Sequence, residues 1–217
     1  MLRSKLVATP YSQGFVEPTI TAATTQYAGN WTVTAPSGRS SGDLLVGIAT
    51  CAQDYLDPSA KVSGWTHRSS TTYGTPDGAV SIFTRVADGT SGDNFTASGI
   101  STLNWTAGIH WIVLMPGGSY SDITTGTGAT GMPNAPANSM VDGVDVSLIV
   151  GHLDTDNVTM TAPSGWTLLA TQYYNYGTPG HTVGVAWALA TSSSMDPAAF
   201  GGGGDDQWIA KNIHIAY

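Results

Sequence analysis

The sequence repeats itself at an interval of about a hundred residues, and this repeat constrains the fold more than any other feature. The recurring signals are Gly-Trp-Thr at 64–66 and 165–167, Tyr-Gly-Thr-Pro at 73–76 and 176–179, and a tryptophan at 105 and 208. The spacing is 101 residues for the first signal and 103 for the other two. Because a repeat of this kind marks a duplicated structural unit, we expect the chain to contain two copies of one fold element.

The stretches between the turn signals alternate with a period of two, which is typical of half-buried β-strands. The alternating positions are Val80, Ile82, Thr84 and Val86 in the first copy and Val183, Val185, Trp187 and Leu189 in the second. Small residues (Gly184, Ala186 and Ala188) occupy the opposite face of the second stretch, so we expect another segment to cover that face closely. Charged residues are only 10% of the chain and no window keeps a helical period, so an all-β fold is predicted.

The repeat boundaries divide the chain into four parts. We expect an extended N-terminal arm (1–22), a first β repeat (23–116), a connector rich in Gly, Pro and Thr (117–139) and a second β repeat (140–217). Two isolated halves would each leave long strand edges open, and open edges invite aggregation. The prediction is therefore one jelly-roll-like antiparallel β-sandwich built from both repeats, with the arm lying on its own domain or docking onto a neighbour.

Composition and charge exclude several classes of partner. The formal net charge of −8 disfavours nucleic acid and anionic membranes, both of which attract clustered Lys and Arg. Cys51, the single cysteine, cannot form an internal disulfide. The N-terminus lacks the apolar core of a signal peptide, and the longest apolar run, 109–115, is too short to cross a bilayer.

Motifs that could carry chemistry lack the structural context they need. A G-x-G-x-x-G match at 126–131 is followed by Pro133 and Pro136, which prevent the helix that a dinucleotide site requires. A G-x-S-x-G match at 38–42 precedes a strand instead of following one. His110 and His214 fall at similar places in the two repeats but without zinc-ligand spacing. We therefore predict no catalytic residue, no metal site and no cofactor, although two of the fourteen aspartates could still meet as a glycosidase pair.

Four tyrosines near the repeated turn are the candidate contact residues. They are Tyr73 in the first repeat and Tyr173, Tyr174 and Tyr176 in the second. Tyrosine combines a large apolar ring with a hydrogen-bonding tip, so such residues can stack on sugars or anchor a protein interface. The alternative is ordinary packing of strands and turns.

Two sets of motifs resemble a known family. Ala35-Pro36-Ser37-Gly38 followed by Gly-Asp-Leu-Leu-Val at 42–46 is similar to a pattern in bacteriophage structural proteins, and so is Pro-Ser-Gly-Trp-Thr at 163–167. The family consists mostly of minor tail proteins, with related domains on virion surfaces. The second repeat departs from the pattern, because Gly42-Asp43 becomes Gly143-Val144-Asp145.

The resemblance implies a non-enzymatic virion structural protein, either a minor tail protein or a capsid decoration protein. Such a protein would assemble in the host cytoplasm, bind other virion proteins through its arm or a sheet face, and be present as a homo-oligomer or in multiple copies. The alternative is a carbohydrate-binding or host-receptor-binding module, and a glycan-degrading enzyme is a third hypothesis.

Overall fold

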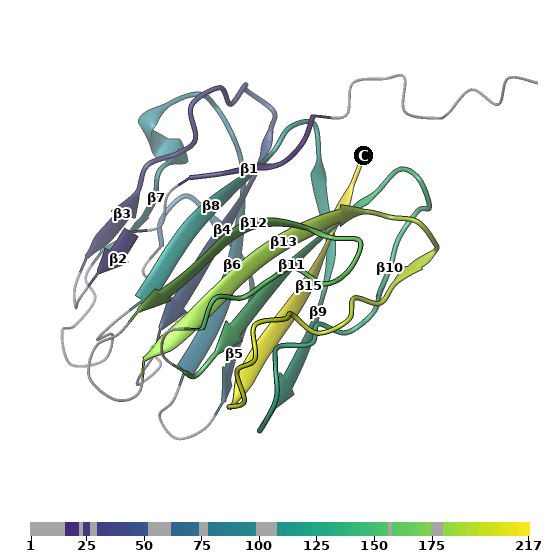
Figure 1. The fold of residues 1–217 in the computed structure, drawn as a ribbon. Coiled ribbons are helices and arrows are strands. Elements are labelled where there is room, and N and C mark those ends of the chain that lie inside the picture. The colour runs from purple at the N-terminus through teal and green to yellow at the C-terminus, as the bar shows by residue number, and fades with distance from the viewer. Residues whose placement is uncertain are drawn as a thin grey trace, which may run out of the picture.

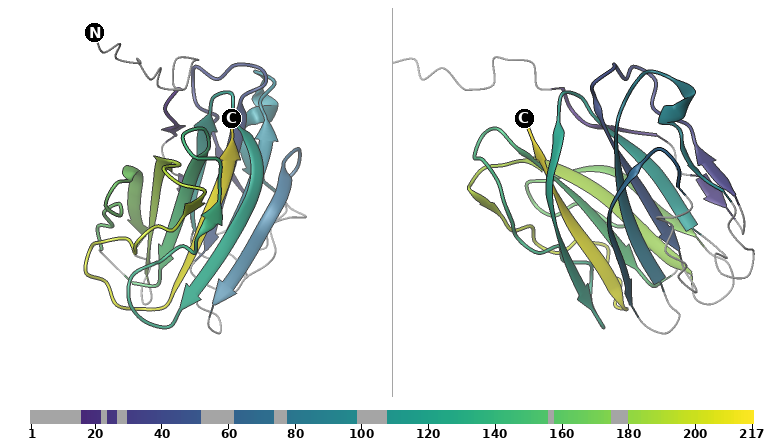
Figure 2. Two further views of the ribbon diagram at one scale, coloured as in Figure 1. Left: turned by 90° about the vertical axis from the view of Figure 1, so that its right-hand side faces the viewer. Right: turned by 180° about the vertical axis from the view of Figure 1, so that it is seen from behind.

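The computed structural model describes residues 16–21, 24–26, 30–51, 62–73, 78–98, 108–155, 158–174 and 180–217, and within them the only helical element is a 3-10 turn, η2 (Ser91–Asp93). Two large antiparallel sheets lie face to face (Figures 1 and 2). The expected all-β sandwich is thus confirmed.

Each large sheet contains five main strands. The first has the order β1 (Thr19–Ile20), β8 (Gly108–Met115), β4 (Leu44–Cys51), β6 (Gly78–Val86) and β5 (Thr66–Tyr73), and β2 (Thr24–Gln26) also pairs with β8. The second has the order β12 (Thr167–Tyr174), β13 (His181–Leu189), β11 (Val146–Leu153), β15 (Trp208–Ala216) and β9 (Ser119–Gly128).

Each repeat forms one whole sheet. The order β8-β4-β6-β5 in the first sheet matches the order β15-β11-β13-β12 in the second, and β5 and β12 carry a register shift at matching places. Among the described strands the chain passes between the large sheets only once, from β8 to β9, so its connectivity is simpler than that of a jelly roll.

The two sheets pack with an approximate twofold relation. On one side of the sandwich β5 of the first sheet lies against β9 and β15 of the second. On the other side β12 of the second sheet lies against β1 and β8 of the first. Because β12 is the counterpart of β5, and β15 of β8, the two sides are equivalent in the way that the halves of a symmetric dimer interface are.

Small two-stranded sheets cover the outer faces. β3 (Trp31–Val33) pairs with β7 (Phe95–Ala97) over the first sheet, and β10 (Asn138–Ser139) pairs with β14 (Ser194–Met195) over the second. An added Cβ at Gly47 would lie 2.9 Å from the ring of Phe95, and one at Gly151 would lie 2.9 Å from the ring of Phe200. At Gly184 an added Cβ would lie 2.9 Å from the sulfur of Met160, and Ala186 and Ala188 are buried in the outer apolar clusters. The close cover expected over these three small residues is therefore confirmed.

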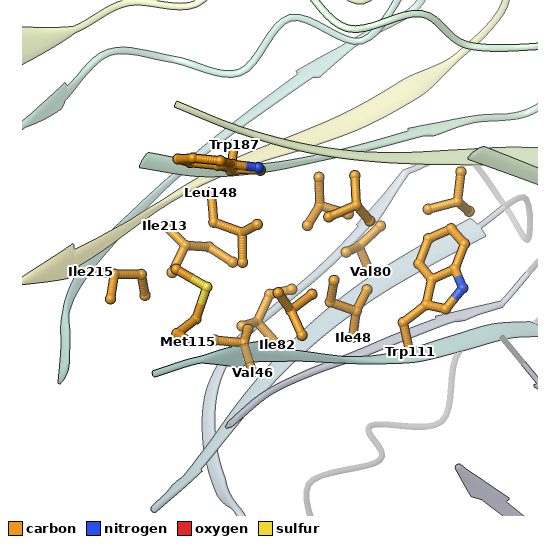
Figure 3. Close-up of a cluster of buried hydrophobic side chains, with 14 of the residues drawn as sticks. Val46, Ile48, Val80, Ile82, Trp111, Met115, Leu148, Trp187, Ile213 and Ile215 are labelled. Carbon is orange, nitrogen blue, oxygen red and sulfur yellow. The ribbon is translucent and has the colours of Figure 1, made fainter. Parts of the chain in front are cut away.

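The inner faces of the two sheets share one apolar core (Figure 3). Val46, Ile48 and Ile82 of the first sheet face Leu148 and Ile213 of the second, and all five side chains are fully buried. Period-two alternation is what places these residues on the inner faces. The two repeats therefore form one core, so neither sheet is an independent domain.

Two boundaries differ from those expected from the sequence. The segment 117–139, expected to be a connector, contains the ten-residue strand β9 and belongs to the second sheet. Its Thr and Gly residues hide the strand because only Tyr120 and Ile123 mark its inward face. The expected arm includes β1, which pairs with Leu114 and Val113 of β8, whereas residues 1–15 lie outside the described residues.

The structural register of the repeats also differs from the sequence signals. Tyr73 pairs with Gly78 as Tyr174 pairs with His181, so the counterpart of Tyr73 is Tyr174 and not Tyr176. The change in spacing from 101 to 103 residues arises in the hairpin loop, which is two residues longer in the second repeat. In the last strands the spacing falls to 100, because Leu44 pairs with Met115 as Val146 pairs with Ile215.

This register separates residues that look equivalent in the sequence. His110 corresponds to Ala210, and His214 corresponds to Leu114. Trp208 corresponds to Gly108, and Trp105 lies outside the described residues. The counterpart of Trp111 is Lys211.

The Gly-Asp motif joins the start of β4 to the end of β6, its neighbour in the sheet, through a set of hydrogen bonds that we call the clasp. Gly42 N donates to Ala87 O at 2.9 Å, Ala87 N donates to Asp43 O at 2.8 Å, and the Asp43 carboxylate accepts a bond from Ser40 N at 2.7 Å. The counterparts in the second repeat are Gly143, Ala190, Asp145 and Val141, and they form the same three bonds. The inserted Val144 therefore leaves this clasp intact.

Candidate functional site

The four candidate tyrosines do not form one surface. Tyr73 is buried, and its hydroxyl lies 3.1 Å from Nδ1 of His152. Tyr174 is half-buried, with its ring centroid 6.0 Å from that of His181. Tyr173 points the other way and is 52% exposed, and Tyr176 lies outside the described residues. Of the three that lie in the described residues, Tyr173 is the one at the surface.

Two buried histidines lie between the sheets beside these tyrosines. The rings of His152 and His181 stack with centroids 5.0 Å apart, and neither side chain is exposed. Among the described residues, neither Nε2 of His152 nor either ring nitrogen of His181 has a hydrogen-bond partner. Burial lowers the pKa of His181 to about 4 and holds the pKa of His152 well below its ordinary value, so both rings are neutral at pH 7.

A more distinctive arrangement lies where β5 meets β9 and β15, and we call it the polar seam. It consists of Arg68, Ser69, Thr71, Tyr120, Thr125 and Lys211. Lys211 is fully buried, and its Nζ donates to the hydroxyls of Ser69 and Thr71 at 2.9 Å and of Thr125 at 3.2 Å. These three bonds match the three donors of an ammonium group. Within the described part of the chain no carboxylate pairs with Lys211, and burial lowers its pKa to about 8.

Arg68 forms the outer end of the polar seam. Its guanidinium lies 4.3 Å from the centroid of the Tyr120 ring, and its Nε donates to the Thr84 hydroxyl at 2.7 Å. These contacts hold the guanidinium beside a pocket of about 320 Å³. The pocket is lined by Gly42, Leu44, Thr66, Arg68, Thr84, Arg85, Val86, Gly118, Ser119 and Tyr120.

At the equivalent places on the other side of the sandwich most residues are apolar, although Thr71 corresponds to Gln172. Arg68 corresponds to Leu169, Ser69 to Ala170 and Lys211 to Trp111. Leu169 and Ala170 pack against the central core, and Trp111 is fully buried in it. The fold therefore accepts apolar residues at these places, and the polar seam is a feature of one side only.

The other buried charges in the described residues have structural partners. Asp93 accepts bonds from Nε of Arg39 at 2.7 Å and Nε of Arg85 at 3.0 Å, and from the backbone of Asp88 and Gly89. These donors hold the pKa of Asp93 well below its ordinary value despite its burial. Asp145 lies 2.6 Å from Nε2 of His214. Such networks tie loops to the sheets.

The sequence did not predict the polar seam, because Ser, Thr and Lys on a strand usually indicate the face that is exposed to solvent. An alignment of the two repeats that matches Ile109-His-Trp111 to Ile209-Ala-Lys211 would have identified Lys211 as the counterpart of Trp111. The alignment of Trp105 with Trp208, at a spacing of 103 residues, concealed this correspondence. In the described residues no group of three or more His, Cys, Asp or Glu could hold a metal ion, and no helix there is long and apolar enough to cross a membrane.

Comparisons with protein-family models, with curated proteins and with solved structures give no significant match to this chain.

Proposed function

We propose that this chain is a non-enzymatic structural protein of a bacteriophage virion, a minor tail or capsid decoration protein, displayed on the particle surface. The observation that carries the proposal is the role of the motifs that resemble the phage family. Asp43 and Asp145 form the backbone clasps, and Trp65 donates from its indole nitrogen to Asn94 O at 3.1 Å. The recurring residues thus fix the backbone geometry, as expected for a protein that presents a rigid surface.

The packing supports the same proposal. Both sheets are covered on both faces, so the sandwich has two cores flanking a central one and little freedom to bend. A rigid scaffold that displays loops and edges suits a particle component that binds other virion proteins. Copies of it would be arranged on the particle by contacts of the N-terminal segment or of a sheet edge.

Immunogold labelling tests this proposal directly. Antibodies against the purified chain should label phage particles from cells that produce it. Size-exclusion chromatography with light scattering should then compare the full chain with a variant lacking residues 1–15, which keeps β1. Label confined to the soluble fraction, with no labelled particle, contradicts the proposal.

The second candidate is a carbohydrate-binding or host-receptor-binding module. The specific observation in its favour is the pocket beside Arg68, because hydroxyl groups and an aromatic ring line it at the edge of the sandwich. Such compact polar and aromatic pockets are common small-ligand sites. A glycan array probed with the full chain tests this candidate.

A further inference from the structure

We infer that the pocket beside Arg68 binds a carboxylate-bearing sugar, with Arg68 as the group that holds the carboxylate. This inference deepens the second candidate function and rests on it. It names the class of glycan that the site selects.

The guanidinium of Arg68 has a free edge. Its Nε is engaged by Thr84 and its face by Tyr120, but in the described residues no acceptor lies within bonding distance of its two Nη atoms. Two parallel N–H groups on a fixed plane match the two oxygens of a carboxylate. Because two contacts already fix the side chain, little further ordering is needed when a ligand binds.

The other described cations are already engaged. Arg39 and Arg85 bond to Asp93, and Lys211 is surrounded by hydroxyls inside the polar seam. Within the part of the chain that the structure describes, Arg68 therefore stands apart as an exposed cation without a carboxylate partner, and the net charge of the chain is −8. Among the described residues, such a point is where an anion would be attracted to this chain.

The repeat supplies an internal control for the role of Arg68. Its counterpart at the matching bulge is Leu169, which packs against the core. An aliphatic side chain thus satisfies the fold at this place. The arginine, its aromatic support and the pocket are additions that folding does not require.

The lining favours a sugar over an acidic peptide. Thr66 and Ser119 offer hydroxyl groups, and burial raises the pKa of Tyr120, which keeps its hydroxyl protonated as a donor. The volume of about 320 Å³ is near the lower end for ligand pockets and suits a single ring. A peptide would need an extended groove for its backbone.

The test uses the full chain, ¹⁵N-labelled, titrated with D-galacturonate and with D-galactose, which has the same ring without the carboxylate. Galacturonate should shift the Arg68 Nε–H signal and the amide signals of 118–120, and galactose should bind at least tenfold more weakly, as expected for loss of a charge-assisted contact. Arg68→Leu, the residue of the matching position, should lose galacturonate binding by about tenfold or more. Arg68→Lys should retain part of it.

Leu168→Ala is the matched control, because it truncates an exposed side chain on β12, at the other edge of the sandwich. It should leave galacturonate binding unchanged. Equal binding of both sugars, or binding that survives Arg68→Leu, overturns the inference. Acetate or an acidic dipeptide that binds as tightly as galacturonate overturns the assignment to a sugar. Labelled particles in the immunogold experiment together with no galacturonate binding would leave the virion role standing and reject this site.

Discussion

The two large sheets share a backbone plan but differ in the chemistry of their inner faces. The first sheet presents Thr50, Gly78 and Trp111 where the second presents His152, His181 and Lys211. Ionisable groups are costly in an interior, because burial disfavours their charged forms. The fold therefore needs only apolar or small residues at these places. The ionisable groups of the second sheet make stability depend on pH without being required by the architecture.

Acid should have the largest effect, and two of the three buried imidazoles that it protonates, His152 and His181, lie in the second sheet. Unfolded histidine takes up a proton below pH 6.5, whereas burial lowers the pKa of His181 to about 4, that of His110 to about 3, and that of His152 well below 6.5. The unfolded state therefore binds more protons between pH 6.5 and these lower values, so stability falls as pH drops. From pH 7 to pH 5 the loss should be about 2 kcal/mol for His110 and about 2 kcal/mol for His181.

Urea unfolding at both pH values measures this loss. His152→Thr, which installs the residue of the first sheet, should reduce this pH dependence, because burial holds the pKa of His152 well below its ordinary value. An unchanged pH dependence in this variant would show that His152 is not held neutral. Hydrogen exchange at pH 5 should quicken more in β11 and β13 than in β4 and β6.

Trp111→Ala should show how much the apolar side contributes. Trp111 is 1% exposed and lies in the central core, so its truncation should cost about 3–5 kcal/mol in the free energy of unfolding. Val86→Ala is the control, because Val86 is 64% exposed and its loss should change stability by less than about 0.5 kcal/mol. A cost below about 1 kcal/mol for Trp111→Ala would mean that the packing at this position is loose.

Lys211 should make the protein more stable in alkali. Burial lowers its pKa to about 8 from the ordinary 10.5, so between these values the unfolded state holds more protons than the folded state. Stability should therefore rise by about 3 kcal/mol from pH 8 to pH 10.5, measured relative to Lys211→Met, which cannot titrate. At pH 7 the Lys211→Met variant should be as stable as the wild type or more so. Parallel pH curves for the two proteins would contradict the burial of this charge.

The effect of a mutation should differ least between the two repeats at the Gly-Asp motif, because both repeats form the same hydrogen bonds there. Asp43→Ala and Asp145→Ala each remove the carboxylate of a clasp and should each cost about 1–2 kcal/mol. Asp145 also contacts His214, which adds to its cost, whereas Asp43 also accepts a bond from Gly117 N at 3.2 Å. A difference of more than about 1 kcal/mol between the two variants, read from chemical denaturation, would show that the clasps are not equivalent.

The sequence predicts the strand content and the duplication, because alternation at Val80–Val86 and Val183–Leu189 reports directly on which residues face a core. It also indicates the covered face at Gly184, where an added Cβ would lie 2.9 Å from the sulfur of Met160. Alternation says which face a residue occupies but not which strand lies beside it. The assignment of one repeat to each sheet therefore required the structure.

The polar seam could not be predicted for a related reason. Ser69, Thr71 and Thr125 have the composition of solvent-facing strand positions, and only the approach of β5 to β9 turns them into ligands for a buried lysine. The inward position of Tyr73 depends on His152, 79 residues away. Contacts between residues this distant in sequence are set by packing and not by local pattern.

The short link between the sheets has a consequence for assembly. Three residues, 116–118, join β8 to β9, and the two sheets meet through equivalent surfaces. A first sheet can therefore pair with the second sheet of another chain as well as with its own, so the monomer and a domain-swapped dimer would contain the same contacts. Tethering favours the monomer only up to the effective concentration that the link imposes, in the millimolar range. Where many copies are crowded together, successive molecules can exchange whole sheets. Continuous chains of subunits then form through the same contacts that hold the monomer together, without a new interface.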